Sequence, residues 1–109
     1  MAYDEGLAGR IRQALSGSPE IVEKKMFGGI GYLLNGNMAC GVNGDALIVR
    51  VGPEAYKSAL AEPYTAVFDL TGRPMTGWVV VKADGIASDE ALQGWVERGL
   101  AFARTLPAK

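Results

Sequence analysis

Histidine is absent from this chain of 109 residues, and cysteine occurs once, as Cys40. Without histidine there is no imidazole for a catalytic triad, for metal ligation or for general base catalysis near neutral pH. A single cysteine cannot form an intrachain disulfide, which suits a reducing compartment, and no CxxC pair is available to hold structural zinc. These absences predict a protein that is not an enzyme and that carries no metal and no cofactor.

The chain also lacks a charge excess and a long apolar run. Eleven Lys and Arg residues are balanced by 12 Asp and Glu residues, which gives a formal net charge of −1. Proteins that bind nucleic acid usually carry a basic excess or a basic face, so direct nucleic-acid binding is disfavoured, although a local patch leaves it open. The first residues have neither the basic region of a signal peptide nor an apolar stretch of membrane-spanning length. We expect a cytoplasmic protein with no membrane segment.

Two Asn-Gly pairs, Asn35-Gly36 and Asn43-Gly44, lie in the first half of the chain. Asn-Gly favours the two-residue turn of a β-hairpin, because both central positions of that turn need positive φ. Apolar runs of strand length lie on either side of each pair. The sequence therefore predicts an antiparallel β-meander with strands over 22–27, 37–42 and 47–51, and with a glycine-interrupted strand that ends at Leu34 between the first two of these.

Helical signals flank the meander. Asp4 is a good N-cap for a first helix, because apolar residues repeat at helical spacing after it. Ser88 begins a last helix in the same way, with acidic residues in its first turn. Between the two helices, the pattern predicts a short helix that opens at Pro53 and a strand over 78–82. A long connection over 63–76 lies between these two elements, and the pattern does not decide whether residues 66–68 within it form a short strand.

The size and composition of the chain fit one domain. Apolar residues make up 49% of the 109 residues, enough for a hydrophobic core without disulfide or metal support. No internal repeat or linker divides the sequence. We predict a single domain over 1–109 of the α+β class, with an N-terminal helix, an antiparallel meander, a short helix, a further strand and a C-terminal helix packed on the sheet.

Glycines cluster between the first two predicted strands, at Gly28, Gly29 and Gly31. A Walker loop or a dinucleotide fingerprint needs its glycines between a strand and a helix, at a different spacing. Glycine inside a strand more often marks a bulge or a close backbone approach. Cys40 shares a predicted strand face with an apolar residue two positions away on either side, which is typical of a small buried hydrophobe rather than a nucleophile.

Basic residues outside the helices give a weak candidate for a binding site. They form an anion site if they converge, whereas each is otherwise a solvated charge or a surface ion pair of small worth. Trp78, close in sequence to a loop arginine, fits a protein-contact hot spot, but its large apolar area favours a core position as the first residue of its strand. The candidate residues are Lys24, Lys25, Arg50, Arg73 and Trp78.

Segments 23–31, 35–38 and 47–52 together resemble the TfoX/Sxy N-terminal domain family. Segment 72–75, the strand that begins at Trp78 and the closing helix fit the same family, so the resemblance covers nearly the whole chain. Its most specific part is a signature at Lys25, Met26, Phe27, Gly28 and Gly29. The resemblance implies an α+β fold similar to secretion-chaperone-like folds, homodimers and no enzymatic activity.

Full-length members of that family regulate natural competence genes in bacteria and are thought to act with the cyclic-AMP receptor protein. They carry a second, C-terminal domain that resembles helix-hairpin-helix modules, whereas this sequence ends at Lys109, so we expect a stand-alone N-terminal domain. The expected function is a non-enzymatic, dimeric interaction module that takes part in transcription regulation through protein contacts. The alternatives are a direct DNA-binding regulator and a small-molecule-sensing domain that uses the Arg50/Arg73 region.

Overall fold

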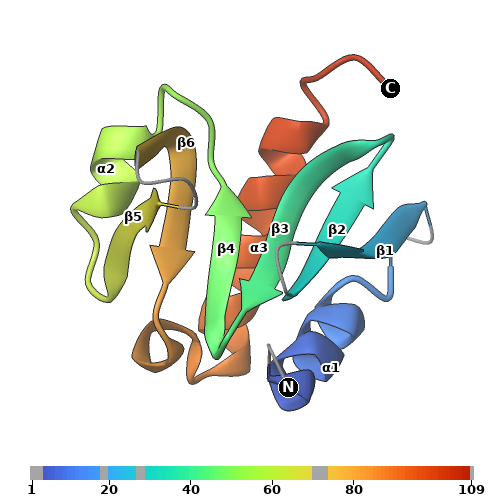
Figure 1. The fold of residues 1–109 in the computed structure, drawn as a ribbon, viewed down its shortest axis with the longest axis horizontal. Helices are drawn as coiled ribbons and strands as arrows, with labels where there is room; N and C mark the ends of the chain where they lie inside the picture. The colour runs from blue at the N-terminus through green and yellow to red at the C-terminus, as the bar shows by residue number, and fades with distance from the viewer. Residues whose placement is uncertain (1–3, 18–19, 27–28, 70–73, 109) are drawn as a thin grey trace.

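A computed structural model describes residues 4–17, 20–26, 29–69 and 74–108. Helices and strands within these residues confirm the predicted α+β class, with a meander, a short helix and a C-terminal helix packed on the sheet (Figure 1). In chain order the elements are α1 (Glu5–Ala14), β1 (Ile21–Met26), β2 (Gly29–Leu34), β3 (Asn37–Asn43), β4 (Ala46–Arg50), α2 (Tyr56–Leu60), β5 (Thr65–Asp69), β6 (Pro74–Val81), the 3-10 helix η1 (Ala83–Ile86) and α3 (Asp89–Ala103).

The first four strands form the predicted meander. Asn35 and Gly36 have φ values of 53° and 83°, so the first turn has the two positive φ angles that an Asn-Gly hairpin needs. The second turn differs from the prediction, because Asn43 pairs with Ala46 and the two loop residues are Gly44 and Asp45. Gly44 alone of that pair has positive φ, at 61°, as in a type II′ turn that begins with glycine.

The second half of the chain adds two strands to the sheet. The strand order is β1-β2-β3-β4-β6-β5, and every neighbouring pair is antiparallel. Strand β5 lies inside the predicted connection 63–76 and settles the open question at 66–68. Strand β6 begins at Pro74, four residues before the predicted start at Trp78, and it inserts between β4 and β5.

One local prediction needs correction, and another is confirmed. Helix α2 begins at Tyr56, because residues 53–55 form a turn and Pro53 precedes the helix rather than opening it. The irregularity expected among the glycines is a register shift between Tyr32 and Leu33 in the pairing of β2 with β3. The expected close approach does occur at Gly29, where a Cβ would overlap the carbonyl oxygen of Val42.

Helices α1 and α3 lie on the same side of the sheet, and α3 runs behind β3 and β4 in the view of Figure 1. Their apolar residues, together with inward side chains from β2, β3, β4 and β6, form one buried core. The phenol of Tyr32 is buried there and donates a hydrogen bond to the carbonyl oxygen of Ala8, 3.3 Å away. The largest fully buried side chains are Tyr32, Ile11, Leu47, Ile48, Ile86, Leu92, Leu100, Val42, Val49, Val79, Val81 and Val96.

Helix α3 approaches strand β3 more closely than a side chain would allow. A Cβ built on Gly99 would overlap the carbonyl oxygen of Ala39 and lie 3.4 Å from Cγ1 of Val49. The contact is rigid on both sides, because backbone atoms cannot rotate away as a side chain can. Glycine at this position therefore sets the distance between the helix and the sheet.

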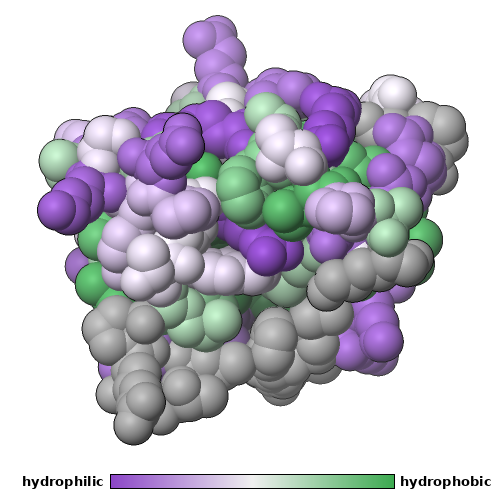
Figure 2. Space-filling model, turned by 90° about the horizontal axis from the view of Figure 1, so that it is seen from above, coloured by the Kyte–Doolittle hydropathy of each residue, from purple (hydrophilic) through white to green (hydrophobic). Residues whose placement is uncertain are grey.

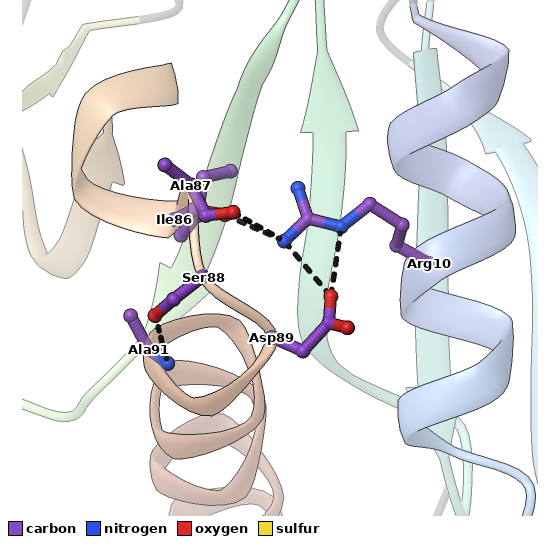
Figure 3. Close-up of polar contacts among 6 residues, drawn as sticks. All are labelled: Arg10, Ile86, Ala87, Ser88, Asp89 and Ala91. Carbon is purple, nitrogen blue, oxygen red and sulfur yellow. Dashed lines mark hydrogen bonds and ion pairs between the residues drawn. The ribbon is translucent and has the colours of Figure 1, made fainter.

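Arg10 connects helix α1 to the start of α3 (Figure 3). Its Nη2 donates to the carbonyl oxygen of Ile86 at 2.7 Å and to Oδ1 of Asp89 at 3.2 Å. Ser88 caps the same helix as predicted, because its Oγ accepts a hydrogen bond from the backbone N–H of Ala91 at 3.1 Å. Arg10 therefore has a structural role in holding the two helices together.

We expect Gly99→Ala to lower the free energy of unfolding by about 1–3 kcal/mol, the usual cost of overpacking a filled site. Gly94→Ala is the matched control on the same helix, since nothing lies within 4 Å of a Cβ at that exposed position. The control should raise stability by about 0.5–1 kcal/mol, because alanine is the better helix former. Urea denaturation of both variants checks this, and equal effects at the two positions would contradict the close approach.

Candidate functional site

Arg50 and Trp78 are brought together by the pairing of β4 with β6. Arg50 is the last residue of β4, and Trp78 is its direct antiparallel partner. Directly opposed residues project from the same side of a sheet, with their Cβ atoms about 5 Å apart. The two side chains are therefore neighbours although 28 positions separate them in the sequence.

Two aromatic rings hold the guanidinium of Arg50. Its Cζ lies 5.1 Å from the ring centroid of Trp78 and 5.4 Å from the ring centroid of Phe102, a residue in the last turn of helix α3. Both distances are within the range of cation–π attraction. A third ring, that of Phe68 on β5, lies 6.1 Å from the ring of Trp78 at a tilt of 48°. We call Arg50, Trp78, Phe102 and Phe68 the Arg50 cluster.

Backbone geometry makes room for Phe102 in the Arg50 cluster. The N–H groups of Val51 and Gly52, the two residues after β4, both donate to the carbonyl oxygen of Gly77 on β6, at 2.8 and 3.0 Å. Gly52 and Gly77 have φ values of 88° and 92°, which favour glycine. A Cβ on Gly52 would lie 2.5 Å from two ring carbons of Phe102. The absence of a Cβ at Gly52 therefore lets the ring lie directly against the main chain.

Arg50 differs from the other half-buried arginines that the structure describes. Arg98 also lies over a ring, 4.1 Å from the centroid of Trp95, but it forms an ion pair with Glu62 at 2.8 Å. Arg10 is paired with Asp89. In the described part of the chain Arg50 has no carboxylate partner and no hydrogen bond from its guanidinium, so its N–H donors are left to solvent or to a ligand.

An apolar groove of about 390 Å³ lies beside the Arg50 cluster. The ring of Phe102 forms one wall of the groove and also contacts the guanidinium of Arg50. This end of the molecule, where β4 and α3 end and β6 begins, shows apolar residues gathered among hydrophilic ones (Figure 2). The groove is lined by Val51, Gly52, Pro53, Glu54, Ala55, Phe102 and Thr105.

The predicted anion site is only partly assembled. Lys24 and Lys25 are exposed on the edge strand β1, three strand positions from β4 and so about 14 Å away at the usual spacing of strands. They do not reach Arg50, whereas Trp78 does. Arg73 lies outside the described residues. Trp78 is half-buried, so its exposure lies between that of a core residue and that of an exposed hot-spot residue.

The structure describes three of the five residues of the signature segment. Lys25 and Met26 are the last residues of β1, and Gly29 opens β2 opposite Met26. Phe27 and Gly28 lie outside the described residues. The close approach of Gly29 to the backbone of Val42 explains why glycine is needed at this position, so no phosphate ligand has to be invoked.

Cys40 lies in the core, as the strand pattern predicts. Its side chain is fully buried among apolar residues, and this burial raises the pKa of the thiol from about 9 to about 12. A thiol that stays protonated is a poor nucleophile. No group of three or more metal-ligating side chains occurs within 4–17, 20–26, 29–69 and 74–108.

Fold and surface together define a small α+β domain with a cationic-aromatic cluster beside an apolar groove. The model of the TfoX N-terminal domain matches residues 13–103, which is most of the chain. The chain therefore belongs to the TfoX N-terminal domain family. No curated protein matches the sequence. Across the described residues, no helix is long and apolar enough to span a membrane.

We expect Cys40 to resist thiol reagents in the folded protein and to react at the rate of global unfolding. The free energy of unfolding should also fall as the pH rises from about 9 to about 12, since only the unfolded thiol ionises in that window. Cys40→Ala should lack this part of the pH dependence. Labelling with a chromogenic disulfide at pH 8 checks the first point, and rapid labelling without denaturant would contradict the burial.

Proposed function

We propose that this protein is a non-enzymatic interaction module that binds a protein partner through the Arg50 cluster and acts in transcription regulation. The family supports the regulatory context, because its full-length members are the regulators that the sequence resembles. The observation that carries the proposal is that Arg50 is half-buried, with its guanidinium near two aromatic rings and no acidic partner among the described residues.

The composition of the Arg50 cluster is that of a protein-contact hot spot. Arginine and tryptophan are the residue types most enriched at such positions, and they are most effective in desolvated pockets. Trp78 and Phe102 are both half-buried, so they are already held in place before a partner arrives. A group that is fixed in advance loses little conformational entropy on binding.

The charge distribution favours a protein partner over DNA. The net charge is −1, and the exposed lysines of β1 lie on another part of the sheet from Arg50. The groove beside Arg50 also contains an acidic residue, Glu54. Phosphate backbones are bound by several cations together, and a site with a single cation releases few counterions and gains little affinity.

Arg50→Ala should lower the recovery of the natural partner by at least about tenfold, since truncating a hot-spot residue costs about 2 kcal/mol or more. The experiment is affinity purification of the tagged protein from its native host, followed by quantitative mass spectrometry. Lys24→Ala is the control, because it removes an equal charge from an exposed site on β1.

Recovery of RNA polymerase or of a cyclic-AMP receptor-type regulator by the unmodified protein, but not by Arg50→Ala, would support the role in transcription. Equal recovery of the same proteins by Arg50→Ala and by the unmodified protein would contradict the proposed site.

We also propose a homodimer that pairs through the edge strand β5. Among the described residues, the large apolar side chains that are exposed are Val22, Tyr64 and Val67, and two of these lie on or beside β5. The opposite edge, β1, carries consecutive charges, which commonly protect an edge strand from pairing. Strand β5 has no lysine and no proline, so its edge is the less protected of the two.

Light scattering at micromolar concentration should give the mass of a dimer, and Val67→Lys should give a monomer, because the new charge lies on the pairing edge. Val22→Lys is the matched control on β1 and should leave the dimer intact. A monomer of the unmodified protein would contradict the proposed dimer, and dissociation by Val22→Lys alone would place the interface at β1.

A further inference from the structure

The guanidinium of Arg50 lies near two aromatic rings, and its N–H donors are unused in the described structure. We propose that these donors bind a carboxylate of the partner protein, and that the neighbouring groove takes a large apolar side chain next to that carboxylate. The inference rests on the proposed function and specifies the chemistry that the partner must present.

A carboxylate is the group that best fits the free edge of Arg50. The guanidinium presents its N–H donors as a planar fork, which matches the two oxygens of a carboxylate in a bidentate pair. The same pairing already occurs elsewhere in this chain, where Arg12 donates to both oxygens of Glu23 at 2.6 and 2.9 Å. Arg98 shows that an arginine stacked on a ring can hold a carboxylate at the same time, since it pairs with Glu62 over Trp95.

The position of the groove restricts which side chain can accompany the carboxylate. Phe102 contacts the guanidinium of Arg50 and also lines the groove, so one ring separates the two subsites. An apolar side chain in the groove therefore belongs to a residue close in sequence to the acidic one. Glu54 lines the groove as well and repels a second carboxylate there, so the acid is directed to Arg50 and the apolar group to the groove.

A protein segment fits this pair of subsites better than a phosphate does. In the described part of the chain no lysine or arginine lines the groove, so a phosphate with two negative charges would find no further cation there. An acidic residue beside a large apolar residue would use both the N–H edge and the apolar walls. The recognised element is therefore an acidic-apolar pair on the surface or in a tail of the partner.

The indole N–H signals of the two tryptophans provide a direct test by nuclear magnetic resonance. The ¹⁵N-labelled protein is titrated with acetyl-Glu-Leu-amide, and the two indole signals are assigned with Trp78→Phe. We expect the Trp78 signal to shift in a saturable way. The Trp95 signal is an internal control and should stay in place, because its stacked arginine is already paired with Glu62.

Two further peptides separate the subsites without changing the protein. Acetyl-Gln-Leu-amide should bind at least about tenfold more weakly, because a charge-assisted bidentate pair is lost. Acetyl-Glu-Ser-amide should also bind more weakly, because it leaves the groove empty. Equal affinity of the Glu and Gln peptides would overturn the carboxylate assignment, and equal affinity of the Leu and Ser peptides would overturn the role of the groove.

Free 4-methylpentanoate tests whether the ligand is a small acid rather than a protein segment. It carries the same two groups without a peptide backbone, and we expect it to bind more weakly than the Glu-Leu peptide. Tighter binding of the free acid would overturn the assignment to a protein segment. Arg50→Lys should weaken binding of the Glu-Leu peptide about tenfold although it keeps the positive charge, because lysine lacks the planar fork.

The titration and the capture experiment can fail independently. If partner recovery depends on Arg50 while the Glu and Gln peptides bind equally, the interaction module stands and the acidic-apolar specificity is wrong. If the peptides bind as expected while recovery is insensitive to Arg50→Ala, the subsites are real but are not used for the partner, and the proposed function is wrong.

Discussion

The distance between helix α3 and strand β3 is the constraint on which the rest of this structure depends. Gly99 lies so close to the carbonyl oxygen of Ala39 that no side chain fits between them. This contact fixes the height of the helix above the sheet, and it thereby fixes Phe102 one turn later along the same helix. The ring of Phe102 then lies against Gly52, where the φ of 88° and the absence of a Cβ leave room for it. Core packing and the surface cluster are therefore parts of one arrangement.

The same constraint explains why Arg50 is held without an acidic partner. A guanidinium on a flexible side chain normally loses rotamer freedom when it binds. Here two rings from different elements, β6 and α3, limit its orientation before any ligand is present. An intramolecular carboxylate, such as the one that pairs with Arg98, would occupy the N–H edge and leave nothing for a partner. Stacking fixes the group and leaves its hydrogen-bonding capacity unused.

Local chemistry made much of the fold predictable from the sequence. The caps at Asp4 and Ser88 each accept a hydrogen bond from a backbone N–H three residues later, as their side chains favour. The Asn35-Gly36 turn likewise follows from two positions that need positive φ. Strand β5 was not firmly predictable, because a short edge strand with mixed burial has no clear periodicity.

The site was less predictable because its residues meet through tertiary contacts. Arg50 and Trp78 were both candidates, but their pairing depends on β6 inserting next to β4 across a long connection. Phe102 was missed, since no local pattern links a helix residue to a strand residue 52 positions earlier. Lys24 and Lys25 were grouped with Arg50 by charge alone, and the strand order separates them.

A double-mutant cycle between Arg50 and Phe102 tests most directly whether the ring of Phe102 holds the guanidinium of Arg50 in place. The unfolding free energies of Arg50→Met, Phe102→Leu and the double variant should give a coupling of about 0.5–2 kcal/mol, the range of a cation–π contact. A parallel cycle of Lys24→Met with Phe102→Leu should be additive, because β2 separates β1 from the strands β3 and β4 on which α3 packs. Additivity of the Arg50 and Phe102 substitutions would show that the ring does not fix the guanidinium and would contradict the proposed arrangement.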